Sequence, residues 1–136
     1  GGLNSGFMLL QYTAAALASE NKVLAHPSSA DSLPSSGSVE DHVSMGANAA
    51  LHARQVICNV QKIIAIELMC AAQAVDFRSK KSQSCKLGKG TKLAYELVRQ
   101  HIPFIQKDCL LHSYIEQAID LVTSGRVAEA VNEFTL

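Results

Sequence analysis

One helical pattern, running from Ala47 to Phe77, constrains the fold more than any other feature of the sequence. Apolar side chains recur in it every three or four positions, and between Ile63 and Val75 nearly every face is apolar. Thirty helical residues would measure roughly 45 Å, more than a small globule needs, so such a helix belongs in a large bundle. The apolar part is too short to span a membrane, and Glu67 inside it is expected to be buried with a hydrogen-bonding or ionic partner.

Other helical patterns flank this segment. Residues 6–25 are apolar on almost every face, which indicates a helix buried all round. Three shorter helical patterns follow. The first covers 91–102. The second starts at Ser113, with Glu116 as its capping partner, and ends at Gly125, and the third is a last turn or two from 127 to 134. No segment has the pattern of a strand. The sequence therefore predicts an all-α fold: a long-helix bundle with a short C-terminal helical region, in a single segment spanning 1–136.

Composition excludes several classes of function. The 136 residues are a one-domain length, and 12 basic residues balance 12 acidic ones, so no charge excess favours nucleic acid. No signal peptide is visible, and no membrane partner is expected. The four cysteines show neither CxxC pairing nor histidines at metal-ligand spacing (Cys58, Cys70, Cys85 and Cys109). We interpret them as reduced thiols of a cytoplasmic protein without a metal site.

A short polar stretch, Ser35 to Gly46, separates the two apolar helical segments. Ser38 followed by Asp41 fits an N-terminal capping pattern, which predicts a helix start here with Glu40 in its first turn. The free N–H groups and the dipole of a helix start favour an anion, so Glu40 is expected to stay ionised and to suit holding a cation. Helix capping alone explains the same pattern.

A set of ordered motifs resembles the aromatic amino-acid lyase family, and within it the histidine-specific ammonia-lyases. The similarity is close from residue 2 to about residue 78 and looser beyond. The motifs that carry it are Gly2-Leu3-Asn4-Ser5-Gly6-Phe7-Met8, Ser19-Glu20-Asn21-Lys22, Ala25-His26-Pro27, Asp31-Ser32, Glu40-Asp41-His42-Val43-Ser44-Met45-Gly46, Ala65-Ile66-Glu67-Leu68, Cys70-Ala71-Ala72-Gln73-Ala74 and Asp76-Phe77-Arg78.

The resemblance implies a homotetramer built on long helices that eliminates ammonia from an aromatic amino acid. Such enzymes use an electrophilic methylidene-imidazolone (MIO) group formed from an internal Ala-Ser-Gly, which this sequence does not contain. The resemblance therefore places the chain in the C-terminal part of such an enzyme, with no cofactor in this segment. The electrophile and the tyrosine base would lie in a missing N-terminal part. A start without methionine, directly before an apolar run, also looks like a cut inside a larger protein.

The resemblance also assigns site residues. Glu40 falls on the acidic position that faces the substrate in histidine-specific members, where phenylalanine-specific members tend to have an amide, so it is expected to be catalytic and substrate-binding. Met8 falls where phenylalanine-specific members carry a lysine, and is expected to line the pocket unless it is simply a core methionine. The family often has Asn-Gln before the acid, whereas this chain has Ser38-Val39. Val39 is thus expected to bind substrate at a position where the family often has a glutamine side chain. The loss of that amide leaves the choice of substrate undecided.

Three hypotheses result. The first is the C-terminal portion of a histidine-specific lyase that converts L-histidine to urocanate and ammonia, inactive in isolation. The second is a fragment of a tyrosine or phenylalanine ammonia-lyase or of an aminomutase. The third is a non-catalytic helical fragment that self-associates to cover its apolar faces. The expected partners are a small aromatic amino acid, the missing N-terminal part and further copies of the chain.

Overall fold

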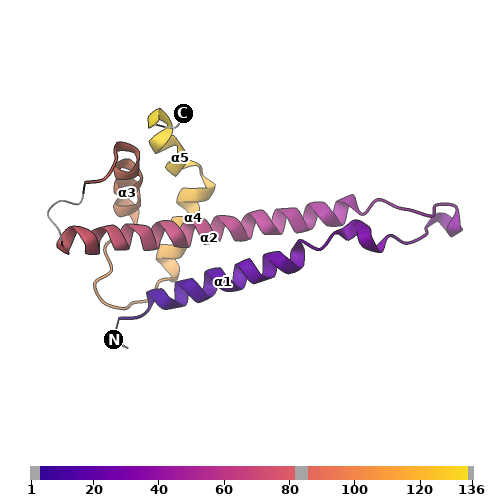
Figure 1. The fold of residues 1–136 in the computed structure, drawn as a ribbon, viewed down its shortest axis with the longest axis horizontal. Helices are drawn as coiled ribbons and strands as arrows, with labels where there is room; N and C mark the ends of the chain where they lie inside the picture. The colour runs from indigo at the N-terminus through magenta and orange to yellow at the C-terminus, as the bar shows by residue number, and fades with distance from the viewer. Residues whose placement is uncertain (1–3, 82–85, 135–136) are drawn as a thin grey trace.

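Two long antiparallel helices form an arm, and three shorter helices gather at one end of it (Figure 1). The computed structural model describes residues 4–81 and 86–134. The helices are α1 (Phe7–Leu24), α2 (Gly46–Lys81), α3 (Lys89–His101), α4 (His112–Thr123) and α5 (Arg126–Val131), with 3-10 turns η1 (Ser28–Asp31), η2 (Ser36–Ser38) and η3 (Asn132–Phe134). In these two described ranges no strand occurs, only an isolated bridge between Ser35 and Glu40. The all-α prediction is confirmed.

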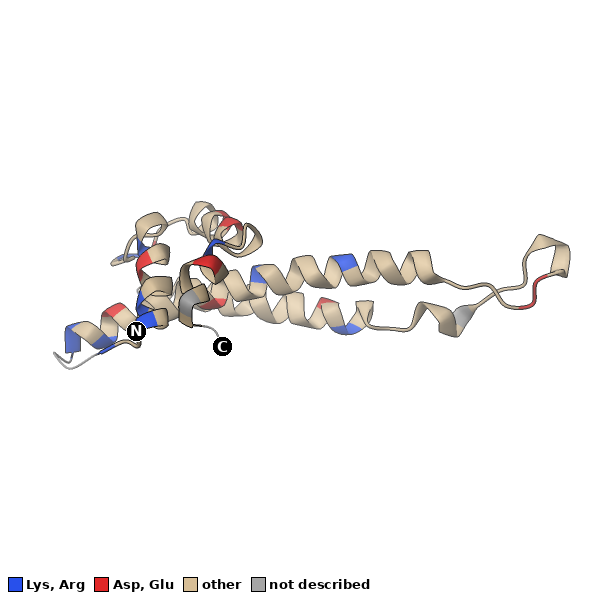
Figure 2. Ribbon diagram, turned by 90° about the horizontal axis from the view of Figure 1, so that it is seen from above, with Lys and Arg blue, Asp and Glu red and all other residues tan. Residues whose placement is uncertain are grey.

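The core lies where the C-terminal helices meet the arm. It is made by the buried residues Leu10, Ala65, Ile66, Met69, Ala72, Val98, Ile102, Ala118 and Leu121. Alanines on α2 allow neighbouring helices to approach closely, and α2 packs against both α1 and α4. Most charged residues also gather at this end, whereas most of the arm is uncharged (Figure 2).

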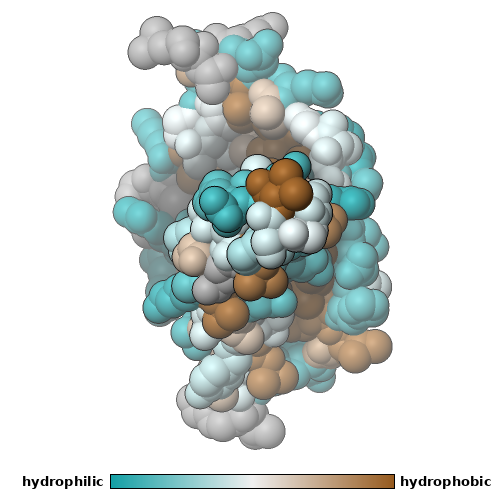
Figure 3. Space-filling model, turned by 90° about the vertical axis from the view of Figure 1, so that its right-hand side faces the viewer, coloured by the Kyte–Doolittle hydropathy of each residue, from teal (hydrophilic) through white to brown (hydrophobic). Residues whose placement is uncertain are grey.

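The arm exposes much of its apolar surface. Large apolar side chains on α1 and α2 are exposed: Met8, Leu9, Tyr12, Val23, Leu51, Ile57, Val60, Ile64 and Phe77. Figure 3, seen from the tip of the arm, shows apolar atoms between polar ones on this surface. Leu10 is the one buried residue of α1, so the prediction of a helix buried all round is wrong for a single chain. The apolar faces of the arm are therefore largely uncovered in this chain.

Helix α2 is longer than the sequence pattern predicted. Its 36 residues correspond to roughly 54 Å. By length and composition alone it could cross a membrane, a test that core helices of water-soluble proteins also pass. Helices α1 and α4 pack on α2, and 28% of its most apolar 18-residue stretch is buried. Glu67 is exposed on it, so the expectation of a buried glutamate is wrong for this chain.

Two predicted helix starts are also wrong. Helix α2 begins at Gly46, whose N–H donates to Ser44 Oγ at 3.3 Å, so Glu40 lies before the helix and not in its first turn. Helix α4 begins at His112 with no side-chain cap, which puts Ser113 inside the helix. The predicted stop at Gly125 is confirmed: its φ of 80° is left-handed, and its N–H donates to the Val122 carbonyl at 3.2 Å.

Candidate functional site

The tip of the arm is a closed loop held by two serines. Ser32 Oγ accepts the Val43 N–H at 2.8 Å and donates to the Val43 carbonyl at 2.9 Å. Further out, the Ser35 N–H donates to the Glu40 carbonyl at 2.9 Å and the Glu40 N–H donates to the Ser35 carbonyl at 3.3 Å. These two rungs tie residues 32–43 into a narrow hairpin-like loop with Glu40 at its outer rung.

Three successive residues of this loop have left-handed backbone conformations. The φ angles are 52° at Ser36, 66° at Gly37 and 70° at Ser38. Only glycine adopts this region at little cost, and other residues held in such conformations cost of order 1–3 kcal/mol each. The geometry explains why no helix starts at Ser38. Strain of this kind occurs most often at binding and catalytic sites, which makes the tip a candidate site.

Glu40 presents its carboxylate to solvent beside an apolar neighbour. Ser35 Oγ donates to Glu40 Oε2 at 3.1 Å, and the residue is exposed. The Val39 side chain next to it is 82% exposed. A fixed carboxylate beside an apolar group fits a ligand with a flat apolar ring and an N–H on its edge. Glu40 and Val39 were predicted from the sequence as site residues, whereas Ser32 appeared there only in the motif Asp31-Ser32 and Ser35 only as the start of the polar stretch, without a role.

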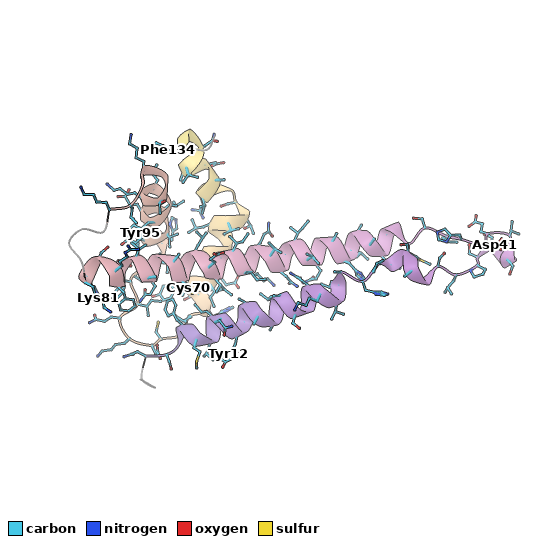
Figure 4. All side chains as sticks on the ribbon, in the orientation of Figure 1. Tyr12, Asp41, Cys70, Lys81, Tyr95 and Phe134 are labelled. Atoms are coloured by element: carbon cyan, nitrogen blue, oxygen red, sulfur yellow. The ribbon has the colours of Figure 1, made fainter. Side chains whose placement is uncertain are left out.

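Met8 lies at the other end of the arm. It is the second residue of α1 and is 53% exposed. The 18 residues of α1 span roughly 27 Å, and the loop carries Glu40 further away still. Tyr12, one turn after Met8, and Asp41, next to Glu40, mark this separation in Figure 4. One chain thus brings Val39 and Glu40 together, but not Met8.

A hollow of about 450 Å³ lies where the tip loop joins the helices. Its lining includes Ser28 and His52, and their Oγ and Nδ1 atoms are buried without a hydrogen-bond partner. Nothing in the sequence had singled out His52 from the other histidines. Buried polar atoms usually have a hydrogen-bond partner, so these two atoms are available to a group or a water molecule in the hollow.

The cysteines and acids do not form a metal site in the part of the chain described here. Those residues include no group of three His, Cys, Asp or Glu that could hold a metal ion. Cys58, Cys70 and Cys109 are free thiols, and partial burial raises the pKa of Cys70. Cys85, which is also expected to be a reduced thiol, lies outside the described residues. The 136 residues contain no Ala-Ser-Gly, the tripeptide from which the family resemblance implies that the methylidene-imidazolone group forms.

Comparison with known proteins decides the family. The family model for aromatic amino acid lyases matches residues 1–100. The chain belongs to the aromatic amino acid lyase family. A curated relative, histidine ammonia-lyase from Chloroflexus aurantiacus, is 59% identical over 131 residues, which cover 96% of this chain and 25% of the relative.

Solved structures of aromatic amino acid lyases share the fold. The crystal structure of histidine ammonia-lyase from Trypanosoma cruzi matches with a TM-score of 0.91 and 42% identity, over 100% of this chain and 26% of that one. Tyrosine aminomutase from Streptomyces globisporus matches with a TM-score of 0.89 and 38% identity, over 99% of this chain and 25% of that one. The chain spans about a quarter of the length of the curated relatives it matches. It is similar to carbon–nitrogen lyases along its whole length.

Proposed function

We propose that this chain is the C-terminal portion of a histidine ammonia-lyase and supplies substrate-binding residues for the conversion of L-histidine to urocanate and ammonia. The observation that carries the proposal is the exposed Glu40 carboxylate, fixed by Ser35 at the tip of the arm in a chain similar to histidine ammonia-lyases. In the reaction the Cα–N bond breaks, a proton leaves Cβ, and a Cα–Cβ double bond forms.

Glu40 holds the imidazole ring of the substrate. Its carboxylate accepts a hydrogen bond from a ring N–H, and the negative charge makes this bond stronger than a neutral one. Val39 lies beside it against the apolar face of the ring. The electrophilic MIO group, which would activate the amino group for departure, comes from chain outside these residues. When Glu40 fixes the ring end of the substrate, the reacting end is aligned with that group. This alignment increases the rate of elimination.

Met8 and Glu40 line one pocket only if they come from different copies of the chain. Their separation exceeds the roughly 27 Å length of α1, far more than a histidine molecule can span. The exposed apolar faces of α1 and α2 supply the surface for such an assembly, which we expect to be the homotetramer. We also expect the enzyme to be cytoplasmic, a compartment in which its thiols would stay reduced.

A second candidate is an aminomutase or a tyrosine or phenylalanine ammonia-lyase. It is favoured by the similarity to tyrosine aminomutase and by Val39, which stands where the family often has glutamine. It is weaker because the curated relative named above, 59% identical, is a histidine ammonia-lyase. A third candidate, a non-catalytic helical fragment, predicts self-association without turnover.

The test is Glu40→Gln in the longer polypeptide that contains this chain, with elimination rates on L-histidine, L-tyrosine and L-phenylalanine. Glutamine keeps the shape and removes the charge, so kcat/KM for histidine should fall by about 10-fold or more while rates on the other two change less. Asp41→Asn, the next acid along the loop, is the matched control and should change little. An unchanged histidine rate in Glu40→Gln removes Glu40 from the site. The 136-residue chain alone should produce no urocanate.

A further inference from the structure

The N-terminal end of α1 is capped by a residue from the C-terminal part of the chain. The Gly6 N–H donates to both carboxylate oxygens of Asp108, each at 3.0 Å, across a separation of 102 residues. In return the Asp108 N–H donates to Asn4 Oδ1 at 3.0 Å. The arrangement resembles a capping box whose two halves come from distant segments. A carboxylate in this place also interacts favourably with the positive end of the helix dipole.

The contact depends on glycine at position 6. A Cβ atom built there would lie 2.9 Å from Asp108 Oδ1, closer than such atoms approach each other, and 3.2 Å from its Cγ, a tight contact, so the Asp108 side chain would have to shift. The absence of a side chain thus lets the carboxylate reach the backbone of α1. Gly6 has a φ of −58°, an ordinary helical value, so close approach and not backbone freedom is the reason for glycine here.

The segment that carries Asp108 is itself fixed to α2. Gln73, 6% exposed, donates to the Ile105 carbonyl at 2.6 Å and accepts the Ile105 N–H at 3.2 Å. Arg99 donates to the carbonyls of Ile102 and Pro103 at 3.0 and 3.3 Å. The loop after α3 therefore has a defined course toward the start of α1, and Asp108 is held there by more than its own contact.

We propose that Asp108 is a positioning residue for the substrate pocket: it fixes the first turn of α1, which carries Met8. This rests on the proposed function, in which Met8 lines the pocket. The Met8 and Leu9 amides donate to the Ser5 and Gly6 carbonyls at 2.9 and 3.0 Å, so Met8 lies within the turn that the cap stabilises. Asp108 lies outside residues 1–100, the part that matches the family model. The C-terminal region thereby acts on the binding of substrate.

The experiment uses the longer, assembled polypeptide and two readouts. Hydrogen exchange at the Met8 and Leu9 amides reports the turn directly, and KM and kcat for L-histidine report the pocket. In Asp108→Ala we expect the opening equilibrium of the turn to rise about fivefold, the factor that corresponds to the loss of one helix cap. This factor is shared between the two readouts, because exchange follows the fraction of chains with the turn open and KM follows the fraction with the turn formed. We expect about 2.5-fold faster exchange and about a twofold rise in KM, with kcat nearly constant. Exchange at the far end of α1 should not change.

Three further variants sharpen the result. Asp108→Asn keeps an oxygen that can accept the Gly6 N–H and should restore most of the protection. Gly6→Ala should impair the turn when Asp108 is present and have little effect when it is alanine, because the close contact is then gone. Asp120→Ala, on α4 and paired with Arg126, is the matched control and should leave both readouts unchanged.

The outcomes separate the inference from the function on which it rests. Unchanged exchange in Asp108→Ala overturns the inference. Faster exchange with an unchanged KM also overturns it, if Met8→Ala in the same enzyme does raise KM. If neither Met8→Ala nor Glu40→Gln alters histidine kinetics, the proposed function fails, whatever the exchange shows. Faster exchange together with a higher KM, reversed in Asp108→Asn, supports the proposal.

Discussion

Replacing Asp76 by asparagine should destabilise the chain far more than the loss of an ordinary surface charge. Asp76, on α2, accepts hydrogen bonds from Arg99 Nε at 2.8 Å and from the Tyr95 hydroxyl at 2.7 Å, and Arg99 Nη2 lies 2.5 Å from its Oδ2. Both charged side chains are largely covered, with 18% of Asp76 and 14% of Arg99 exposed. An asparagine would turn an N–H₂ or a neutral oxygen toward Arg99 and leave its charge without a counterion.

The size of the effect follows from this burial. Removing one member of a fully buried ion pair costs 3–5 kcal/mol, and the remaining exposure here lowers the expected cost to about 2–3 kcal/mol. The matched control is Glu96→Gln on the same helix as Arg99. Glu96 pairs with Lys92 at 3.7 Å, with 47% and 64% of the two side chains exposed. An exposed pair four residues apart contributes about 0.3–0.5 kcal/mol.

The assay is urea unfolding of the 136-residue chain, followed by circular dichroism at 222 nm. Asp76→Asn should lower the midpoint by about 1–2 M urea, and Glu96→Gln by no more than about 0.3 M. Addition of 1 M salt should abolish the smaller difference and leave the larger one, because covered charges are screened less. Equal shifts in the two variants would show that the Asp76 network does not fix α3 and the following loop to α2.

Other predictions concern single groups. The hydrogen bond to Asp76, together with desolvation and the Asp76 charge, raises the pKa of Tyr95. The interaction of protonated Tyr95 therefore stabilises the fold fully below about pH 10, and this stability is lost as the pH rises through the raised pKa. Asp76→Asn should make this alkaline loss smaller when the free energy of unfolding is measured between about pH 9 and 12. Exposed Cys109 should be alkylated before Cys70, whose pKa burial raises, and peptide mass spectrometry gives the order; the reverse order would contradict the placement of the two thiols. Gly125→Ala should lower the free energy of unfolding by about 1 kcal/mol, because alanine is strained at a φ of 80° and no atom lies within 4 Å of the added methyl group. A larger loss of stability in thermal unfolding would refute this.

The long helices could be predicted from the sequence because their signals are local. Apolar residues at helical spacing located α1 and α2 to within a few residues, and Gly125 marked the end of α4. The family was likewise visible in ordered motifs, and the match over residues 1–100 confirms it.

The tip loop could not be predicted from local signals. Ser38 and Asp41 have the spacing of a helix cap, yet the left-handed backbone at Ser38 and the rung between Ser32 and Val43 take the chain elsewhere. The cap on α1 was equally hidden, because its two halves lie 102 residues apart. Burial was misjudged for a related reason. The apolar pattern of α1 and α2 predicted burial on nearly every face, but many of their large apolar side chains are exposed in this chain.

Contact between Glu40 and the imidazole ring of a substrate would be seen directly in a structure of the longer polypeptide with L-histidine bound. We predict a ring nitrogen within about 3 Å of a Glu40 carboxylate oxygen, with Met8 of another copy lining the same pocket. A ligand bound elsewhere, with the Glu40 carboxylate still facing bulk water, would contradict the account.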